Sequence, residues 1–122
     1  MRSAERRKAN VLEMKCLGSL VGVSRMDGVR NEAVRMRAGI ERELASRADQ
    51  RVLRWFGHVE RMDQNRMASS VCMAEASGRR RPRLDWMDGV KVALGNRGMT
   101  VEAARQYAKD RKEWRALVHI CN

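Results

Sequence analysis

The chain of 122 residues is long enough for one modest hydrophobic core and too short for two independent cores, which predicts a single domain. It carries 26 Lys and Arg against 15 Asp and Glu, and a net charge of +11 favours polyanions as partners because phosphate binding releases counterions. The three cysteines are odd in number and widely separated, so the sequence predicts no disulfide framework. It has no apolar run of about 18 residues, so it predicts no membrane span.

Helical spacing of the apolar residues, with glycines as punctuation, predicts an all-α fold. We expect a small irregular bundle of about five or six helices in a single helical domain over residues 1–122. Its expected parts in chain order are an N-terminal helix pair (1–39), a long basic amphipathic helix plus a short helix (40–76), an Arg-rich loop (77–83) and C-terminal helices (84–122).

Capping residues and glycines predict where several of these helices begin and end. The first helix is expected to end at Gly18 and the second at Gly39, because glycine adopts the left-handed conformation common after a helix. Thr100 is expected to cap the last helix through its hydroxyl group. We expect that last helix to bend near Asp110.

The long helix, expected over about 41–62, carries two different faces when its residues are spaced at the helical repeat. The face expected to be buried is apolar and consists of Leu44, Ala48, Val52, Trp55, Phe56, Val59 and Met62. The second face, here called the basic stripe, consists of Arg47, Arg51, Arg54, His58 and Arg61. Because His58 belongs to the stripe, we interpret it as part of a nucleic-acid-binding surface, with a solvated histidine as the alternative.

Each of the three tryptophans is followed by a valine four residues later, a spacing that stacks both side chains on one helix face. We interpret these pairs as a shared core consisting of Trp55, Phe56, Val59, Trp86, Val90, Trp114 and Val118. The alternative is that the tryptophans stack on bases, as aromatic residues do in proteins that bind single strands. The aliphatic neighbours of the tryptophans favour the core.

The Arg-rich loop, SGRRRPR, surrounds the only proline with four arginines. They are Arg79, Arg80, Arg81 and Arg83. Proline keeps the preceding residue extended, so the guanidinium groups spread apart, and together they are predicted to clamp phosphates at a helix N-terminus. A flexible linker or a nuclear-import signal is an equally open interpretation of the loop.

The sequence offers no arrangement typical of an enzyme. His58 has no partner nucleophile, Ser69 and Ser70 lie in no known motif, and no cysteine has a paired base. Neither histidine lies at metal-ligand spacing from a cysteine. We therefore predict no catalytic residue, no metal, no cofactor and no enzymatic activity.

Three segments in order combine tryptophan with basic residues: RVLRWFGHVERM, GRRRPRLDWMDGV and KDRKEWRALV. The residues that match a known family's motifs are, in the first segment, Arg54, Trp55, Gly57, His58, Val59, Arg61 and Met62; in the second, Pro82, Arg83, Trp86 and Asp88; and in the third, Asp110, Arg111, Trp114 and Arg115. At these positions the chain resembles the extreme C-terminal region of reverse transcriptases from non-LTR (LINE-type) retrotransposons, beyond the polymerase thumb. The segment MKCLGSLVGVSRMDGVRNEAV also resembles the helix pair that precedes this region in the family.

Two departures limit what the resemblance implies. Arg81 stands where the family has a glycine before arginine-proline, and the loop is shorter. The aromatic-x-aspartate-aspartate motif, whose carboxylates hold the polymerase metal ions, is absent, as is the family's endonuclease domain. The resemblance therefore implies a non-catalytic C-terminal fragment without polymerase activity.

Taken together, the residues and the resemblance predict an intracellular module, nuclear or cytoplasmic, that binds the RNA or DNA backbone through the basic stripe and the Arg-rich loop. Such contacts position a protein on nucleic acid and read little sequence. The alternative is a structural fragment that docks on the remainder of the reverse transcriptase and binds nothing alone. An incidental basic surface also stays open, as do the RNA-versus-DNA preference and the oligomeric state.

Overall fold

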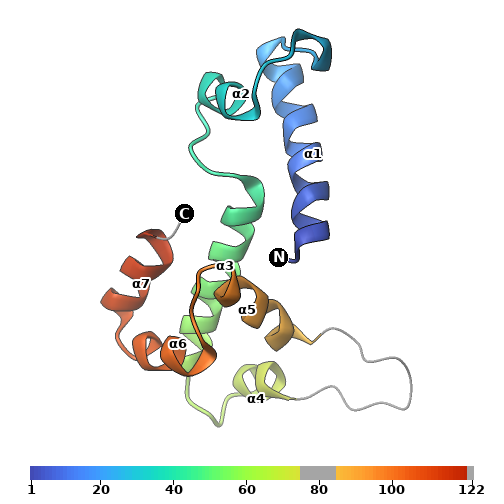
Figure 1. The fold of residues 1–122 in the computed structure, drawn as a ribbon. Helices are drawn as coiled ribbons and strands as arrows, with labels where there is room; N and C mark the ends of the chain where they lie inside the picture. Colours follow the sequence, from blue (N-terminus) through green and yellow to red (C-terminus); the bar gives the residue numbers. More distant parts are fainter. Residues whose placement is uncertain (75–84, 121–122) are drawn as a thin grey trace, which may run out of the picture. The chain divides into compact units, whose positions relative to one another are not determined.

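The computed structural model describes residues 1–74 and 85–120 of the chain (Figure 1). They contain seven α-helices, one 3-10 helix and no strand, which confirms the predicted all-α fold. The elements are α1 (Ser3–Val21), η1 (Arg25–Asp27), α2 (Asn31–Arg37), α3 (Leu44–Glu60), α4 (Met67–Met73), α5 (Trp86–Gly95), α6 (Val101–Ala108) and α7 (Arg111–Ile120). The helices outnumber the expected five or six because Asp110 separates α6 from α7 instead of bending one helix.

The chain divides into two compact units, Met1–Ala48 and Asp49–Asn122. The single domain over residues 1–122 stays a prediction, because a division into compact units does not decide whether either part folds alone.

In the first unit, α1 continues past Gly18, so the prediction that the helix ends there is wrong. The helix continues to Val21 and is capped by Gly22, whose φ of 71° is left-handed. Gly18 is needed for a different reason: a Cβ atom at this position would lie 2.8 Å from the carbonyl oxygen of Val23, where the chain turns back. The glycine in the sequence therefore marks a close backbone approach and not a helix end.

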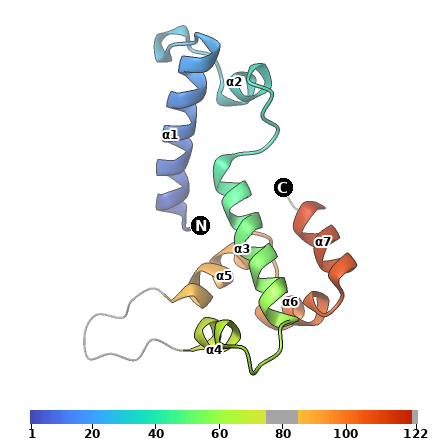
Figure 2. The same ribbon diagram turned by 180° about the vertical axis from the view of Figure 1, so that it is seen from behind.

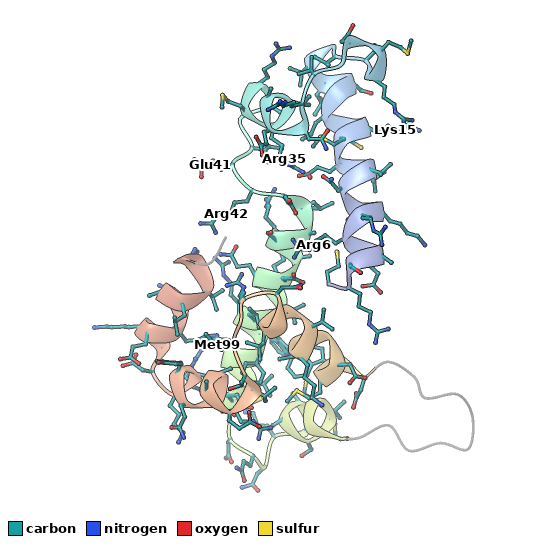
Figure 3. All side chains as sticks on the ribbon, in the orientation of Figure 1. Arg6, Lys15, Arg35, Glu41, Arg42 and Met99 are labelled. Carbon is teal, nitrogen blue, oxygen red and sulfur yellow. The ribbon has the colours of Figure 1, made fainter. Side chains whose placement is uncertain are left out.

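A buried carboxylate connects α1, α2 and the start of α3 in the first unit. Glu13 on α1 is 8% exposed, and its Oε2 accepts hydrogen bonds from Arg35 Nε (3.3 Å) and Nη2 (3.0 Å). Arg35 extends from α2 towards α1 (Figure 3). The second oxygen of Glu13, Oε1, accepts a hydrogen bond from the backbone N–H of Leu44 (3.0 Å) at the start of α3. One carboxylate thus pairs with a largely buried guanidinium and accepts a hydrogen bond from a helix amide that has no partner within the helix.

We predict that Glu13→Ala destabilises the first unit by about 3 kcal/mol, because it leaves the largely buried charge of Arg35 without its carboxylate partner. Urea unfolding followed by far-UV circular dichroism would measure the change. Glu41→Ala is the matched control, since Glu41 is exposed, and it should change stability by less than about 0.5 kcal/mol. Equal effects of the two substitutions would contradict the assigned role of Glu13.

In the second unit, α5, α6 and α7 are arranged around α3 (Figures 1 and 2). The buried core cluster consists of Leu53, Phe56, Val90, Ala93, Leu94, Ala104, Ala108, Trp114 and Val118. The ring of Phe56 lies between two indoles, with centroids 5.7 Å from Trp114 and 6.4 Å from Trp86. Trp86 is only partly buried and packs against this cluster. Val59 is 1% exposed and also buried.

Trp55 is not part of the core, and the prediction that it is buried is wrong. Its side chain is 44% exposed, and Leu44 from the same predicted face is 42% exposed. The buried face of α3 is rotated by roughly a quarter turn from the predicted arc, so that it includes Leu53 (1% exposed). Asp49 explains the error: it is 3% exposed and accepts a hydrogen bond from Asn96 Nδ2 (3.1 Å), so a carboxylate occupies the buried face.

The side chain of Trp114 on α7 lies directly against α3 at Gly57. A Cβ atom on Gly57 would lie 2.1 Å from Nε1 and 2.2 Å from Cδ1 of Trp114. The indole is 3% exposed, and its Nε1–H donates to the carbonyl oxygen of Leu53 (2.9 Å), one turn before Gly57. The ring is held by this hydrogen bond and by Phe56, so only a glycine leaves room for it.

We predict that Gly57→Ala destabilises the second unit by about 2–4 kcal/mol, because the added methyl group overpacks the core and displaces the buried indole N–H. Gly89→Ala on α5 is the matched control, since a Cβ there meets no atom within 4 Å. It should stabilise the protein by about 0.5–1 kcal/mol, because alanine favours a helix over glycine. Thermal unfolding of both variants provides the comparison, and a higher melting temperature for Gly57→Ala would contradict the close packing at Gly57.

Candidate nucleic-acid interface

Every residue of the predicted basic stripe is exposed: Arg47, Arg51, Arg54 and His58 on α3, and Arg61 directly after the end of this helix. Arg47 belongs to the first unit, and the other four belong to the second. The rotation of the buried face by a quarter turn moves it away from the stripe, so the stripe residues lie outside the core. The four residues of the second unit are therefore available for a partner on the face that α3 presents to α7 and to solvent.

A second set of basic residues, which the sequence alone did not assign to binding, comes from α7. Arg111, Arg115 and His119 recur every four residues and so share one face of that helix. Asp110 fixes where the helix begins, because its Oδ1 accepts hydrogen bonds from the backbone N–H groups of Lys112 (2.7 Å) and Glu113 (3.3 Å). The spacing is visible in the sequence, but the proximity of this face to α3 is not.

The two basic faces meet in a groove of about 550 Å³. Its lining, here called the α3–α7 groove, consists of Arg54, His58, Arg61, Arg111, Trp114, Arg115, Val118 and His119. Four arginines and two histidines thus line the groove, and no acidic side chain is among the lining residues. Trp114 and Val118 are 3% and 1% exposed, so the groove has an apolar base beneath its basic walls.

Two arginines of the groove are held in place by contacts within the second unit. Arg61 Nη1 donates to the carbonyl oxygen of Ala108 (2.7 Å) at the end of α6. Arg54 Nη2 lies 2.9 Å from His119 Nε2 and, because a guanidinium can only donate, this nitrogen of His119 accepts. The carbonyl of Val118 accepts from Gln50 Nε2 (3.2 Å), which further ties α7 to α3. These contacts preorganise the walls of the groove.

The chemistry available in the groove is recognition of anions. Arginine keeps its charge at any physiological pH, and its planar fork fits two oxygens of a phosphate at once. Within residues 1–74 and 85–120, no group of three His, Cys, Asp or Glu side chains is placed to hold a metal ion. Ser69, one of the two serines without a motif, is 7% exposed and buried.

Asp85 and Asp88 form a capping box at the start of α5. The side chain of Asp85 accepts from the backbone N–H of Trp86 (2.9 Å), and Asp88 Oδ2 accepts from the backbone N–H of Asp85 (3.1 Å). The two carboxylates therefore cap the N-terminus of α5. The arginines that precede them, Arg79, Arg80, Arg81 and Arg83, lie outside the described residues, so the phosphate clamp stays a prediction.

Comparisons with protein families, with curated proteins and with solved structures found no match to this chain. The resemblance to LINE-type reverse transcriptases therefore depends on the sequence segments alone. In the described part of the chain, no helix combines the length and the apolar content that crossing a bilayer requires.

We predict that Arg61→Ala destabilises the second unit by about 1 kcal/mol, because it removes a charged hydrogen bond to the end of α6. Arg51→Ala, one stripe position that is exposed and outside the groove lining, should change stability by less than about 0.5 kcal/mol. Urea midpoints of the two variants provide the comparison. If Arg51→Ala is the more destabilised variant, Arg61 does not have this structural role.

Proposed function

We propose that this chain is a non-catalytic nucleic-acid-binding module that holds RNA or DNA by its backbone phosphates in the α3–α7 groove. The observation that carries the proposal is the set of six basic side chains, without an acidic one, that line this groove from two helices. A single basic helix face is common on protein surfaces. Two such faces on either side of one groove concentrate positive potential where a polyanion can enter.

The partner expected for this chemistry is a chain of phosphates rather than one acidic side chain. The net charge of +11 favours an extended polyanion, because each neutralised phosphate releases counterions. Arginine contacts to phosphates fix position and carry little sequence information. We therefore expect strong salt dependence and weak sequence preference, whether the ligand is RNA or DNA.

The resemblance to LINE-type retrotransposon proteins supports a more specific origin for this module. Its motifs include groove residues of both helices: Arg54, His58 and Arg61 in the first segment, and Arg111 and Arg115 in the third. We propose that the chain corresponds to the C-terminal region of such a reverse transcriptase and has no polymerase activity of its own.

A second candidate function is a docking fragment that packs on the rest of the reverse transcriptase. Large apolar side chains on α1 favour it: Val11 is 69% exposed, Leu12 is 57% exposed and Leu20 is 80% exposed. Exposed side chains of this kind gain free energy when a partner covers them. This candidate predicts self-association or an unstable isolated chain, together with weak nucleic-acid binding.

The test is fluorescence anisotropy with labelled hairpin RNA and duplex DNA across a salt series. We predict that replacing Arg54, Arg111 and Arg115 together with glutamine lowers the slope of log affinity against log salt on duplex DNA. The slope should fall by about 0.9 for each phosphate that the variant no longer neutralises. Glutamine keeps part of the side-chain stem, so packing changes little.

The matched control replaces Arg66, Lys91 and Lys109, three exposed basic residues of the second unit outside the groove lining, with glutamine. It removes the same net charge and should keep the wild-type slope. Equal slopes for the two triple variants would overturn the groove as the binding site. Weak, shallow binding by the wild type would favour the docking fragment. A variant with Arg79, Arg80, Arg81 and Arg83 changed to alanine separately tests the clamp.

A further inference from the structure

Trp55 is an exposed aromatic residue beside the basic groove. It is 44% exposed, whereas Trp114 is 3% exposed and Trp86 packs against the core. The indole lies outside the core cluster of the second unit and presents an apolar ring to solvent. It follows Arg54 in the sequence and lies on the helix that supplies one wall of the groove.

His58 connects Trp55 to the groove. The two rings are in contact, with centroids 5.2 Å apart and planes tilted by 44°. His58 is also one of the residues that line the α3–α7 groove. Consequently the aromatic surface of Trp55 begins at the wall of the groove, and a ligand whose anionic part enters the groove brings its neighbouring groups to the indole.

We propose that Trp55 stacks on an unpaired base of a nucleic-acid strand whose phosphates lie in the α3–α7 groove. Single strands are then preferred to duplexes, because paired bases are already stacked on one another and present no free face. The inference rests on the proposed function, since the groove arginines supply the attraction for the backbone. Indole–base stacking occurs with any base, so the expected selectivity is for strandedness and not for sequence.

The alternation of charge and aromatic surface argues for a nucleic acid at Trp55. A partner protein would have to supply both apolar side chains that cover the indole and carboxylates that neutralise the adjacent arginines. A nucleotide strand satisfies both at once, because phosphate neutralises arginine and the base covers the ring. The residues that supply the two parts, Arg54 and Trp55, follow one another on α3.

The experiment compares two labelled DNA probes of equal charge, an oligothymidylate of about 12 nucleotides and an abasic strand of the same length. The wild-type protein should bind the oligothymidylate roughly 5-fold to 150-fold more tightly than the abasic strand, the range that one aromatic stack supplies. Trp55→Leu should remove this preference and leave affinity for the abasic strand unchanged. Trp55→Phe, which keeps a ring, should retain part of the preference.

Tyr107→Leu is the matched control, because Tyr107 is an aromatic residue 45% exposed on α6 and does not line the groove. It should bind both probes as the wild type does, and far-UV circular dichroism should show that all variants keep their helices. Equal affinity of the wild type for the two probes would overturn the stacking role and leave the phosphate groove intact. Failure to bind either probe would overturn both the stacking role and the proposed function. A preference for bases that survives Trp55→Leu would place the stacking residue elsewhere.

Discussion

The indole of Trp114 lies against the backbone of α3 at Gly57, and this close approach determines where α7 runs. The ring would overlap a Cβ atom at position 57, and its N–H is bonded to the carbonyl oxygen of Leu53. Arg111 and Arg115 lie close to Trp114 on α7. When the indole packs against α3, these two arginines therefore lie near Arg54 and Arg61. The interaction that stabilises the second unit is thus the one that brings the two basic faces together.

The four arginines around the groove repel one another, which destabilises the free protein. Two contacts within the fold reduce this destabilisation. Arg61 donates to a backbone carbonyl at the end of α6, and Arg54 lies against His119, so part of their hydrogen-bonding capacity is satisfied without a ligand. The remaining positive potential is the property that a phosphate chain would neutralise. A surface of this kind costs stability in the free protein and recovers it when a polyanion binds.

Local features of the fold could be predicted from the sequence, and tertiary ones could not. Thr100 caps α6 through a hydrogen bond from the backbone N–H of Ala103 (3.3 Å), as expected, because a cap depends only on neighbouring residues. The buried face of α3 was misjudged because Asp49 is buried against Asn96, a pairing that helical periodicity cannot reveal. The exposure of Trp55 follows from the same rotation. The basic stripe was visible as a repeat, but its partner face on α7 depends on the packing of Trp114, which only the structure supplies.

The most direct test of phosphate binding in the groove is to observe the arginine side chains themselves. Nitrogen–proton NMR spectra of the arginine Nε–H groups, recorded while an oligonucleotide is titrated into the protein, report which guanidiniums meet the ligand. We expect the largest shifts at Arg54, Arg111 and Arg115, and small ones at Arg105 on α6, which is 3.5 Å from Glu60 in an ion pair. If the groove arginines do not shift while arginines elsewhere do, the α3–α7 groove is not where this chain holds nucleic acid.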